Sequence, residues 1–324
     1  MQIYNLQQDD PSVSAARCQR VNFTGCGKRV GGDEDHRRGH RFSKRITMIK
    51  DSSNLISLIL ISGATASLFA AELTPPGASA LGYSKRVINE RPVAADIAPG
   101  ESGNHKWFSG QWYAKPPSLD HYSMTNGVLT LSLDGDLVSA SHDFSPGILP
   151  PLPGGQGFYV EFDIQLSDND PDHFPAVWLM PVEHNRKRLD SYPGDPAGFE
   201  RWLELDVDEG GFGPGLTGTV HDWRGIYPNL QHAQNPNNVS KTLLDRAQKH
   251  TFGASFDPAH NGATWWVDGV KQHSAEPPYV PAVGVQQHFY LIISAQSHGK
   301  RLPYSMAVSG VRAFVPPSST LPSK

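Results

Sequence analysis

The amino-acid sequence predicts an all-β fold, a two-sheet sandwich or jelly roll, and three observations lead to this prediction. Short segments with strand-like alternation recur roughly every 10–20 residues from about residue 120 onward. Helical periodicity is nearly absent. Of the 324 residues, 31 are Gly, 27 are Pro and 10% are aromatic, whereas only 19% are charged, which suits many strands joined by turns. Because there is no internal repeat, we expect one domain over residues 82–318.

The N-terminal part of the chain has a different character. Residues 1–47 are polar and lack an apolar period. From Met48 the pattern is that of a secretory signal peptide, with Lys50, an apolar run over 55–69 and small residues before Glu72. The run is short for the ~20 residues of a spanning helix, and an uncleaved anchor is the alternative. We expect a non-native or disordered extension (1–47), a signal peptide (48–71), a linker (72–81), the folded domain (82–318) and a tail (319–324).

Cysteine use and charge exclude several classes of function. Both cysteines, Cys18 and Cys26, lie in the extension, so a chain starting near Glu72 has no disulfide and no thiol nucleophile. The net charge of −4 provides no basic field for nucleic acid. We expect a secreted or periplasmic protein of bacterial type, monomeric, without cofactor or metal. We expect no stable membrane insertion after signal cleavage.

Several segments are predicted to be strands. Residues 127–135 and 157–168 alternate regularly, and Glu161 and Asp163 would give the second a half-buried polar face. Residues 174–181 are a short apolar run ended by Pro. The further candidates are 201–208, 216–223, 250–257, 263–270, 288–296 and 304–314. Asp268–Gly269 is a turn signal, and residues 241–249 are the one weak helical pattern.

The stretch "RWLELDVDEGGFG" (201–213) concentrates carboxylates on one predicted strand. Side chains two apart share a face, so Trp202, Glu204 and Asp206 point one way and Leu203, Leu205 and Val207 point into the core. Regular alternation would turn Glu209 inward, at a cost of about several kcal/mol for an unpaired carboxylate. A β-bulge near residues 207–208 would return Glu209 to the polar face.

Three explanations of this acidic strand remain open on the residues alone. A solvated edge strand is the first, although Trp202 and the clean apolar alternation weaken it. A Ca²⁺ site is the second, but Ca²⁺ ligands surround a loop, whereas these carboxylates form a row. Glycoside hydrolysis is the third, with two carboxyl groups about 5–5.5 Å apart in retaining enzymes. The Cα atoms of Glu204 and Glu209 would be ~13 Å apart, a gap that two long side chains partly close.

The pattern Glu204-Leu-Asp206-Val-Asp-Glu209 resembles the E-x-D-x-x-E signature of glycoside hydrolase family 16, in its bulged form. Other segments resemble strands of that family in the same order, over roughly residues 120–316. They are "FPAVWLMP" (174–181), "TGTVHDW" (217–223), "HTFGASFDP" with "ATWWVDGV" (250–270), "HFYLIISAQ" (288–296) and "MAVSGVRAF" (306–314).

The resemblance implies a concanavalin A-like β-jelly-roll with a substrate cleft on its concave sheet. It implies Glu204 as nucleophile, Glu209 as general acid and base, and Asp206 as electrostatic support, with retention at an internal β-linkage. The substrate would be a polysaccharide or oligosaccharide, and the bulged form favours a β-1,3-glucan (laminarin-like). A non-catalytic carbohydrate-binding jelly roll and a transglycosylase with the same glycosyl-enzyme intermediate are the alternatives.

Some residues depart from the family pattern. Leu203 stands where Gly is common, and Asp208 stands where an apolar residue is common, which leaves Asp208 as an alternative acid if the bulge is absent. The segment "SAQSHG" (294–299) departs from an Asn-containing strand of the family, which puts sugar contacts there in doubt.

Substrate contacts are predicted for six further side chains, each with a plainer alternative. Aromatic faces stack on sugars, so Trp202 is expected to bind substrate. For Trp178 and Trp223, a role in substrate binding and a place in the core or at the rim are equally favoured. The resemblance places His221 near the general acid, and the alternative is that His221 is a structural histidine. Arg224 would contact an anionic sugar, and the alternative is a plain surface arginine. Gln296 would hydrogen-bond to sugar hydroxyls. Trp265 and Trp266 face opposite ways, and one of them is core.

Overall fold

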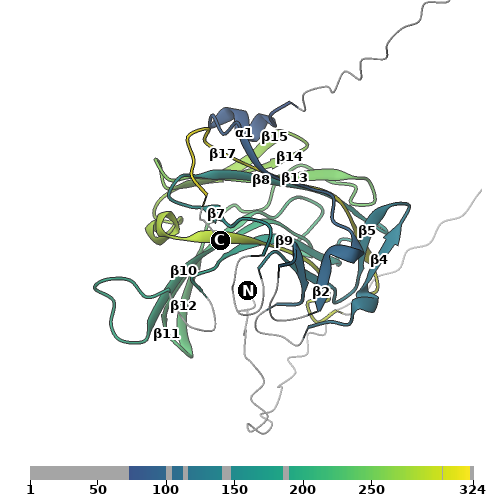
Figure 1. The fold of residues 1–324 in the computed structure, drawn as a ribbon, viewed down its shortest axis with the longest axis horizontal. Helices are drawn as coiled ribbons and strands as arrows, with labels where there is room; N and C mark the ends of the chain where they lie inside the picture. Colours follow the sequence, from purple (N-terminus) through teal and green to yellow (C-terminus); the bar gives the residue numbers. More distant parts are fainter. Residues whose placement is uncertain are drawn as a thin grey trace, which may run out of the picture. The chain divides into compact units, whose positions relative to one another are not determined.

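The computed structural model describes residues 73–99, 104–111, 116–140, 147–184, 190–300 and 302–321. The predicted extension, the signal peptide and both cysteines lie outside these residues. Within them the chain forms two β-sheets packed face to face, which confirms the predicted all-β jelly-roll sandwich (Figure 1). Among the described residues, no helix has the length and apolar character needed to cross a membrane.

The first sheet has eight strands, all in antiparallel pairs. In spatial order they are β15 (Val270–Ala275), β14 (Gly262–Val267), β13 (His250–Asp257), β8 (Phe158–Leu166), β17 (Ser305–Val315), β5 (Val128–Ser132) and β4 (Tyr122–Thr125), and β1 (Lys85–Glu90) also pairs with β17. Asp268 and Gly269 have positive φ values of 49° and 77° and form the predicted turn between β14 and β15.

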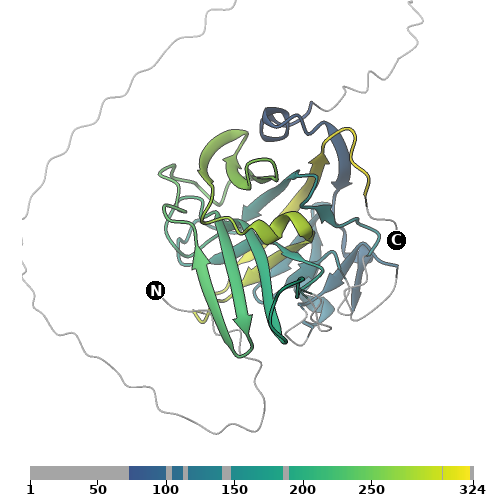
Figure 2. The ribbon, with the colours of Figure 1, turned by 90° about the vertical axis from the view of Figure 1, so that its left-hand side faces the viewer.

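The second sheet has nine strands and carries the acidic strand. Their order is β12 (Asn229–Gln234), β11 (Thr219–Ile226), β10 (Phe199–Glu209), β9 (Phe174–Pro181), β16 (His288–Gln296), β6 (Asp136–Val138), β3 (Trp107–Ser109) and β2 (Ile97–Pro99), and β7 (Leu152–Pro153) also pairs with β16. Only β2 and β3 pair in parallel among these described strands. Figure 2 shows β10, β11 and β12 side by side in green.

Helical structure is limited to short segments in the described residues. They are α1 (Pro76–Ala80) and three 3₁₀ turns, η1 (Ala94–Asp96), η2 (Leu119–His121) and η3 (Ala282–Gln286). The helix that this weak pattern over 241–249 would predict is absent, because these residues form bends, a turn and irregular chain. Leu244 and Arg246 of this segment are buried. They contribute to the core and to the site, and such contacts override a weak helical propensity.

The main core lies between the two sheets and follows from strand alternation. Leu203, Leu205 and Val207 of β10 are fully buried in it, together with Phe162 of β8 and Leu291 of β16. A second apolar cluster covers the outer face of the second sheet and includes Trp178, Trp202 and Trp223. The outer face of this sheet is therefore largely buried as well.

The outer face of the first sheet differs from the half-buried face predicted for β8. Glu161 and Asp163 are only 5% and 9% exposed. Arg312 of β17 donates to Glu161 from Nε at 2.5 Å and to Asp163 from both terminal nitrogens at 2.8 Å. The carboxylates are buried because this cation satisfies them, which alternation along one strand does not reveal.

The segment expected to be a linker (72–81) contains α1, which packs on the first sheet (Figure 1). Ala78 is fully buried beside Tyr159 and Trp266. A Cβ on Gly77 would lie 2.3 Å from the Tyr159 ring, so only Gly allows this close approach. The small residues taken as linker composition are thus contact residues. The remaining domain boundaries stay predictions.

The predicted strands are confirmed as β5, β8, β9, β10, β11, β13, β14, β16 and β17. The strands that prediction missed are mostly short, and β2, β3, β6 and β7 have only two or three residues each. A period of two cannot be recognised over so few residues. These strands are specified by the neighbours they pair with.

Candidate active site

The acidic strand carries the predicted β-bulge. On the neighbouring strand β9, Trp178 lies opposite Asp206 and Val177 lies opposite Asp208. Two consecutive residues of β9 therefore face a three-residue stretch of β10, and Val207 is the additional residue. A bulge of this kind changes the faces to which the following side chains point.

The bulge returns Glu209 to the outer face of the second sheet. Glu209 lies opposite Ala176, which belongs to the outer apolar cluster, whereas Asp208 lies opposite Val177 of the central core. Glu204 and Asp206 alternate with buried core leucines and share the outer face. One strand thus presents Glu204, Asp206 and Glu209 on the same face and turns Asp208 inward.

Asp208 is paired with a cation inside the protein. Arg246 donates from Nη1 to Oδ2 at 2.6 Å and from Nη2 to Oδ1 at 2.9 Å, and Nη2 also bonds the Gly215 carbonyl at 3.0 Å. Both side chains are at most 5% exposed. A carboxylate held by a two-pronged guanidinium is unsuited to give a proton to a substrate, so Asp208 is no alternative acid.

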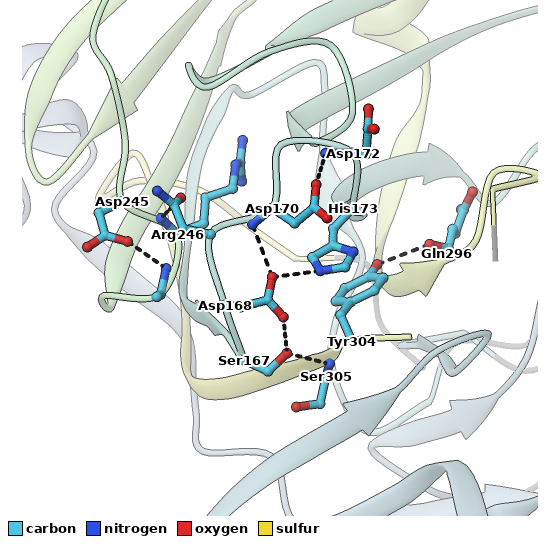
Figure 3. Close-up of polar contacts among 12 residues, drawn as sticks. Ser167, Asp168, Asp170, Asp172, His173, Asp245, Arg246, Gln296, Tyr304 and Ser305 are labelled. Atoms are coloured by element: carbon cyan, nitrogen blue, oxygen red, sulfur yellow. Dashed lines mark hydrogen bonds and ion pairs between the residues drawn. The ribbon is translucent and has the colours of Figure 1, made fainter. Parts of the chain in front are cut away.

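The loop that carries Arg246 is anchored to the end of β8 (Figure 3). The Arg246 backbone N–H donates to Asn169 Oδ1 at 2.9 Å, and its carbonyl accepts from Leu166 N–H at 2.8 Å. The loop after β8 is itself fixed, since Asp168 accepts from His173 Nε2 at 2.7 Å. The cation opposite Asp208 therefore has a defined position.

Trp265 supports the bulge from the core side. Its Nε1 donates to the Asp206 carbonyl at 2.7 Å, which satisfies a buried backbone group beside the disrupted ladder. The ring packs so closely on Gly218 that a Cβ there would lie 2.2 Å from it. His273 stacks on the Trp265 ring at 4.6 Å. Of the two adjacent tryptophans, Trp265 is therefore the core residue of the site.

Each outward carboxylate has a polar neighbour. Trp223 Nε1 donates to Glu204 Oε2 at 2.9 Å, and His221 Nε2 lies 2.7 Å from Asp206 Oδ2. The side chains of Asp206 and Glu209 share a hydrogen bond. The structure thus brings the three predicted catalytic residues together with His221 and Trp223.

Burial and mutual repulsion perturb these carboxyl groups. Burial, followed by the charge of Asp206, raises the pKa of Glu204 to about 7, against the smaller lowering effects of His221 and Trp223. Burial also raises the pKa of Asp206 well above its usual value, although a hydrogen bond from Glu209 opposes this. Groups with a pKa near neutrality are suited to proton transfer. Clusters of this kind are common at catalytic sites.

Trp202 does not have the exposed face that sugar stacking requires. It is 2% exposed, with His184 stacked on it at 3.6 Å and Trp223 at 5.7 Å. His232 of β12 stacks in turn on Trp223 at 4.2 Å. Cross-strand register places Trp202, Trp223 and His232 in one row. The expected role of Trp202 as a sugar platform is therefore corrected to that of a packed support for the site.

Trp178 lies on the outer face beside Asp206 and is 8% exposed. Its Nε1 donates to Ser294 Oγ at 3.3 Å, and Gln111 donates to the same oxygen at 3.2 Å. Gln296 is two residues after Ser294 on β16 and lies two strands from β10. A substrate contact by Trp178 or Gln296 remains a prediction.

Arg224 does not join the site. His221 and Trp223 point to the outer face, so alternation along β11 places Arg224 on the opposite face. Its guanidinium is more than half exposed and lies 3.7 Å from Asp222. The expected contact with an anionic sugar is thus corrected to a surface ion pair.

Three residues near the site were not predicted from the sequence. Arg246 and His232 contact it from distant segments and show no local signal. Phe212, in the Gly-rich loop directly after Glu209, is 48% exposed and packs edge-on against Phe174 at 5.5 Å. An apolar aromatic residue inside the Gly-rich segment "GGFGPG" is a local signal from which Phe212 could have been predicted as a site residue.

Two groups of described side chains have the spacing of metal ligands, with donor atoms within 4.8 Å of one another. They are Glu204, Asp206 and His221, and His184, Asp190 and Glu200. Both groups already have close internal contacts, because His221 Nε2 lies 2.7 Å from Asp206 Oδ2 and His184 Nδ1 lies 2.8 Å from Asp190 Oδ2. The absence of a metal remains a prediction.

Comparisons with known proteins find similar solved structures, whereas no family model and no curated protein matches the chain. A β-porphyranase from the human gut bacterium Bacteroides plebeius is 14% identical, with 62% of this chain and 80% of that chain covered and a TM-score of 0.46. The κ-carrageenase of Pseudoalteromonas carrageenovora is 16% identical, with 61% and 83% covered and a TM-score of 0.42. A non-specific endo-β-1,3(4)-glucanase from family GH16 is 16% identical, with 71% and 90% covered and a TM-score of 0.40.

Replacing Arg246 with Met should destabilise the protein strongly, because Asp208 would be left as an unpaired buried charge. We expect a loss of about 3–5 kcal/mol in the free energy of unfolding, measured by urea denaturation. The double variant Asp208→Leu/Arg246→Met should recover most of it, since no charge remains. Lys241→Met, in the same loop but exposed, should change stability by less than about 0.5 kcal/mol. A similarly small effect of Arg246→Met would contradict the pairing.

Replacing Glu204 with Gln should stabilise the protein at high pH and leave it nearly unchanged at low pH. The folded-state pKa of Glu204 is about 7, against 4.5 for the ordinary group. The wild type therefore loses stability as the pH rises from about 4.5 through 7, whereas Gln does not titrate. We expect an advantage for Glu204→Gln on the order of 3 kcal/mol at pH 8 that vanishes at pH 4, by urea denaturation. Glu276→Gln, which removes an exposed carboxylate, is the control, and an equal gain at both pH values would refute the prediction.

Proposed function

We propose that this protein is a retaining endo-glycosidase that hydrolyses internal β-linkages of a polysaccharide. The observation that carries the proposal is the bulged strand β10, which presents Glu204, Asp206 and Glu209 on one face while Arg246 neutralises Asp208. Retaining glycosidases need two carboxyl groups close together, one as nucleophile and one as acid and base. The position of these groups on a rigid strand supports this chemistry.

In the first step, the Glu204 carboxylate attacks the anomeric carbon while the bond to the leaving oxygen breaks. Glu209 gives its proton to that oxygen, so the leaving sugar departs neutral. The product is a covalent ester between Glu204 and the sugar. Trp223 bonds Glu204 Oε2 and holds the carboxylate in place for this attack. Only the ionised form of Glu204 is a nucleophile, so the reaction should quicken as the pH rises through about 7.

In the second step, the Glu209 carboxylate takes a proton from water as the water oxygen attacks the anomeric carbon. The bond to Glu204 breaks, and both carboxyl groups return to their starting states. Two inversions give net retention at the anomeric carbon. Asp206 hydrogen-bonds Glu209 and repels charge on Glu204, so it couples the protonation of the two groups.

The substrate we propose is a β-1,3-glucan of the laminarin type, on the resemblance of the bulged motif. Trp202 has no free face for a sugar ring, whereas Phe212 is half exposed and follows Glu209 by three residues. Phe212 is therefore our candidate for stacking on a sugar next to the cleaved bond. Aromatic side chains offer such apolar faces.

A panel of β-glycans tests the proposal, with laminarin, carrageenan, agar and mixed-linkage glucan as substrates and reducing-end release as the readout. We expect wild-type protein to cleave laminarin. Glu204→Gln and Glu209→Gln should each lower the rate by at least about 10³-fold, because each removes a group that takes part in both steps. Asp222→Asn, on the opposite face of β11, is the matched control and should retain activity.

The other outcomes of this panel decide between the alternatives. If the wild type and Glu204→Gln both bind one glycan and neither cleaves any, the protein is a non-catalytic carbohydrate-binding jelly roll. Products longer than the starting oligosaccharide would mean a transglycosylase. If the wild type, but not Glu204→Gln, cleaves another glycan, the proposed glycosidase activity stands and that glycan replaces the β-1,3-glucan as the proposed substrate.

We also propose that the protein acts outside the cytoplasm, in the medium or the periplasm. The support is the signal-peptide pattern from Met48 to Ala71, with its basic start, apolar run and small residues. N-terminal sequencing of protein recovered after expression in a bacterium should find a mature chain that begins near Glu72. Recovery in the cytoplasm with residues 48–71 retained would refute this proposal.

A further inference from the structure

One oxygen atom of Asp206 lies next to a ring nitrogen without forming a hydrogen bond to it. Asp206 is 2% exposed, and among the described residues its Oδ2 has no hydrogen-bond partner. His221 Nε2 lies only 2.7 Å from this oxygen, so the nitrogen is close but the N–H axis of the ring is not directed at Oδ2. A buried carboxylate oxygen that lacks a donor is costly, and such an exception calls for an explanation.

Two atoms that bind the same metal ion are directed at the ion and not at each other. Ligand distances of about 2.0–2.2 Å for nitrogen and oxygen around zinc leave two neighbouring ligand atoms about 3 Å apart. His221 Nε2 and Asp206 Oδ2 have close to this separation. Glu204 adds a third donor, because one donor atom of each of the three side chains lies within 4.8 Å of the others. Glu204, Asp206 and His221 thus form a chelating cluster.

Neighbouring side chains orient two members of the chelating cluster. A histidine that binds a metal usually bonds its other ring nitrogen to a second residue, which fixes the orientation of the ring. His221 Nδ1 is hydrogen-bonded to His232 Nε2, and His232 in turn stacks on Trp223 at 4.2 Å. Trp223 Nε1 donates to Glu204 Oε2 at 2.9 Å. Residues of β11 and β12 therefore hold His221 and Glu204 in the way that is typical of metal sites.

The donor set of the chelating cluster indicates which metal it would take. It consists of one imidazole nitrogen and two carboxylate groups. Zn²⁺ binds His nitrogen and Asp or Glu oxygen together, whereas Ca²⁺ and Mg²⁺ prefer oxygen ligands alone. Three protein ligands leave the fourth tetrahedral position to water. Glu204 is only partly buried, which gives an ion access to the cluster from solvent.

We propose that Glu204, Asp206 and His221 bind a zinc ion, and that this ion reversibly blocks the attack of Glu204 on a sugar. The carboxylate electron pair that would form the bond to the anomeric carbon is then engaged by zinc, and removal of the ion by a chelator frees it again. A zinc site departs from the sequence-based expectation of a protein without metal. The blocking of catalysis rests on the proposed function, whereas the binding of zinc does not.

The test uses the full chain with Cys18→Ser and Cys26→Ser as the parent protein, because thiolates are themselves zinc ligands. His221→Gln removes the nitrogen ligand, and Asp206→Asn removes the charge of one oxygen ligand. His184→Gln is the matched control, since His184 belongs to the other group of described side chains with metal-ligand spacing. Thermal unfolding establishes that each variant folds.

Isothermal titration calorimetry with zinc chloride measures the binding. We expect one zinc ion per chain in the parent and in His184→Gln, and no comparable binding of calcium chloride. His221→Gln and Asp206→Asn should each weaken zinc binding by at least about 100-fold, because even residues that only orient a ligand change metal affinity by about 10–100-fold. No zinc binding by the parent, an unchanged affinity in His221→Gln, or a loss confined to His184→Gln would overturn the proposal.

X-ray absorption at the zinc edge identifies the ligands in the parent protein, so it does not depend on the folding of a variant. We expect one imidazole nitrogen per zinc ion, with oxygen atoms as the other ligands. Two or more imidazoles, or a sulfur ligand, would place the ion elsewhere and overturn the proposal.

Reducing-end release from the glycan that the parent cleaves tests the blocking. Saturation with zinc should slow cleavage by at least about 10-fold, because a nucleophile bound to the ion cannot attack, and a chelator should restore the rate. Cleavage at full rate by the zinc-loaded protein would overturn the blocking. If the parent cleaves a glycan but binds no zinc, this inference fails and the proposed function stands. If it cleaves no glycan with or without zinc but binds the ion through His221, the proposed function fails and the zinc site stands.

Discussion

The β-bulge at Val207 is the feature on which the candidate site depends. Without the additional residue, strand alternation would expose Asp208 on the outer face and bury Glu209 in the core. The bulge reverses these positions, and its cost is met by two interactions inside the sandwich. Arg246 neutralises the inward Asp208, and Trp265 satisfies the backbone carbonyl of Asp206. The core side of the sheet therefore determines which carboxylates reach the functional face.

The outer face combines burial with negative charge, which ordinarily disfavours folding. Glu204 and Asp206 have raised pKa values because water is largely excluded around them. A hydrogen bond from Trp223 and the nearby His221 oppose this rise at Glu204. Such a balance leaves Glu204 able to change protonation near neutral pH, at some expense of stability. A trade-off between stability and activity is common at catalytic sites.

The row of stacked rings from His184 to His232 gives this site its rigidity. Trp202 and Trp223 stack on each other across β10 and β11, His184 stacks on Trp202, and His232 stacks on Trp223. Rings packed in this way cannot turn toward a substrate, but they hold the groups bonded to them. Trp223 keeps Glu204 in place, and His232 is held beside His221. Trp202, which was predicted to bind a sugar, and Trp223, which was predicted to lie in the site or the core, thus support the carboxylates.

The all-β class, most of the longer strands and the shared face of Glu204 and Asp206 can be predicted from the amino-acid order alone, because a period of two is a local property of the chain. That order also indicated a bulge, since a buried, unpaired Glu209 was energetically excluded. Three contacts arise only when distant segments pack together: Arg246 pairs with Asp208 from 38 residues away, His232 adjoins His221, and Trp202 is buried against His184 and Trp223. These contacts depend on strand register and loop packing, which no local pattern encodes.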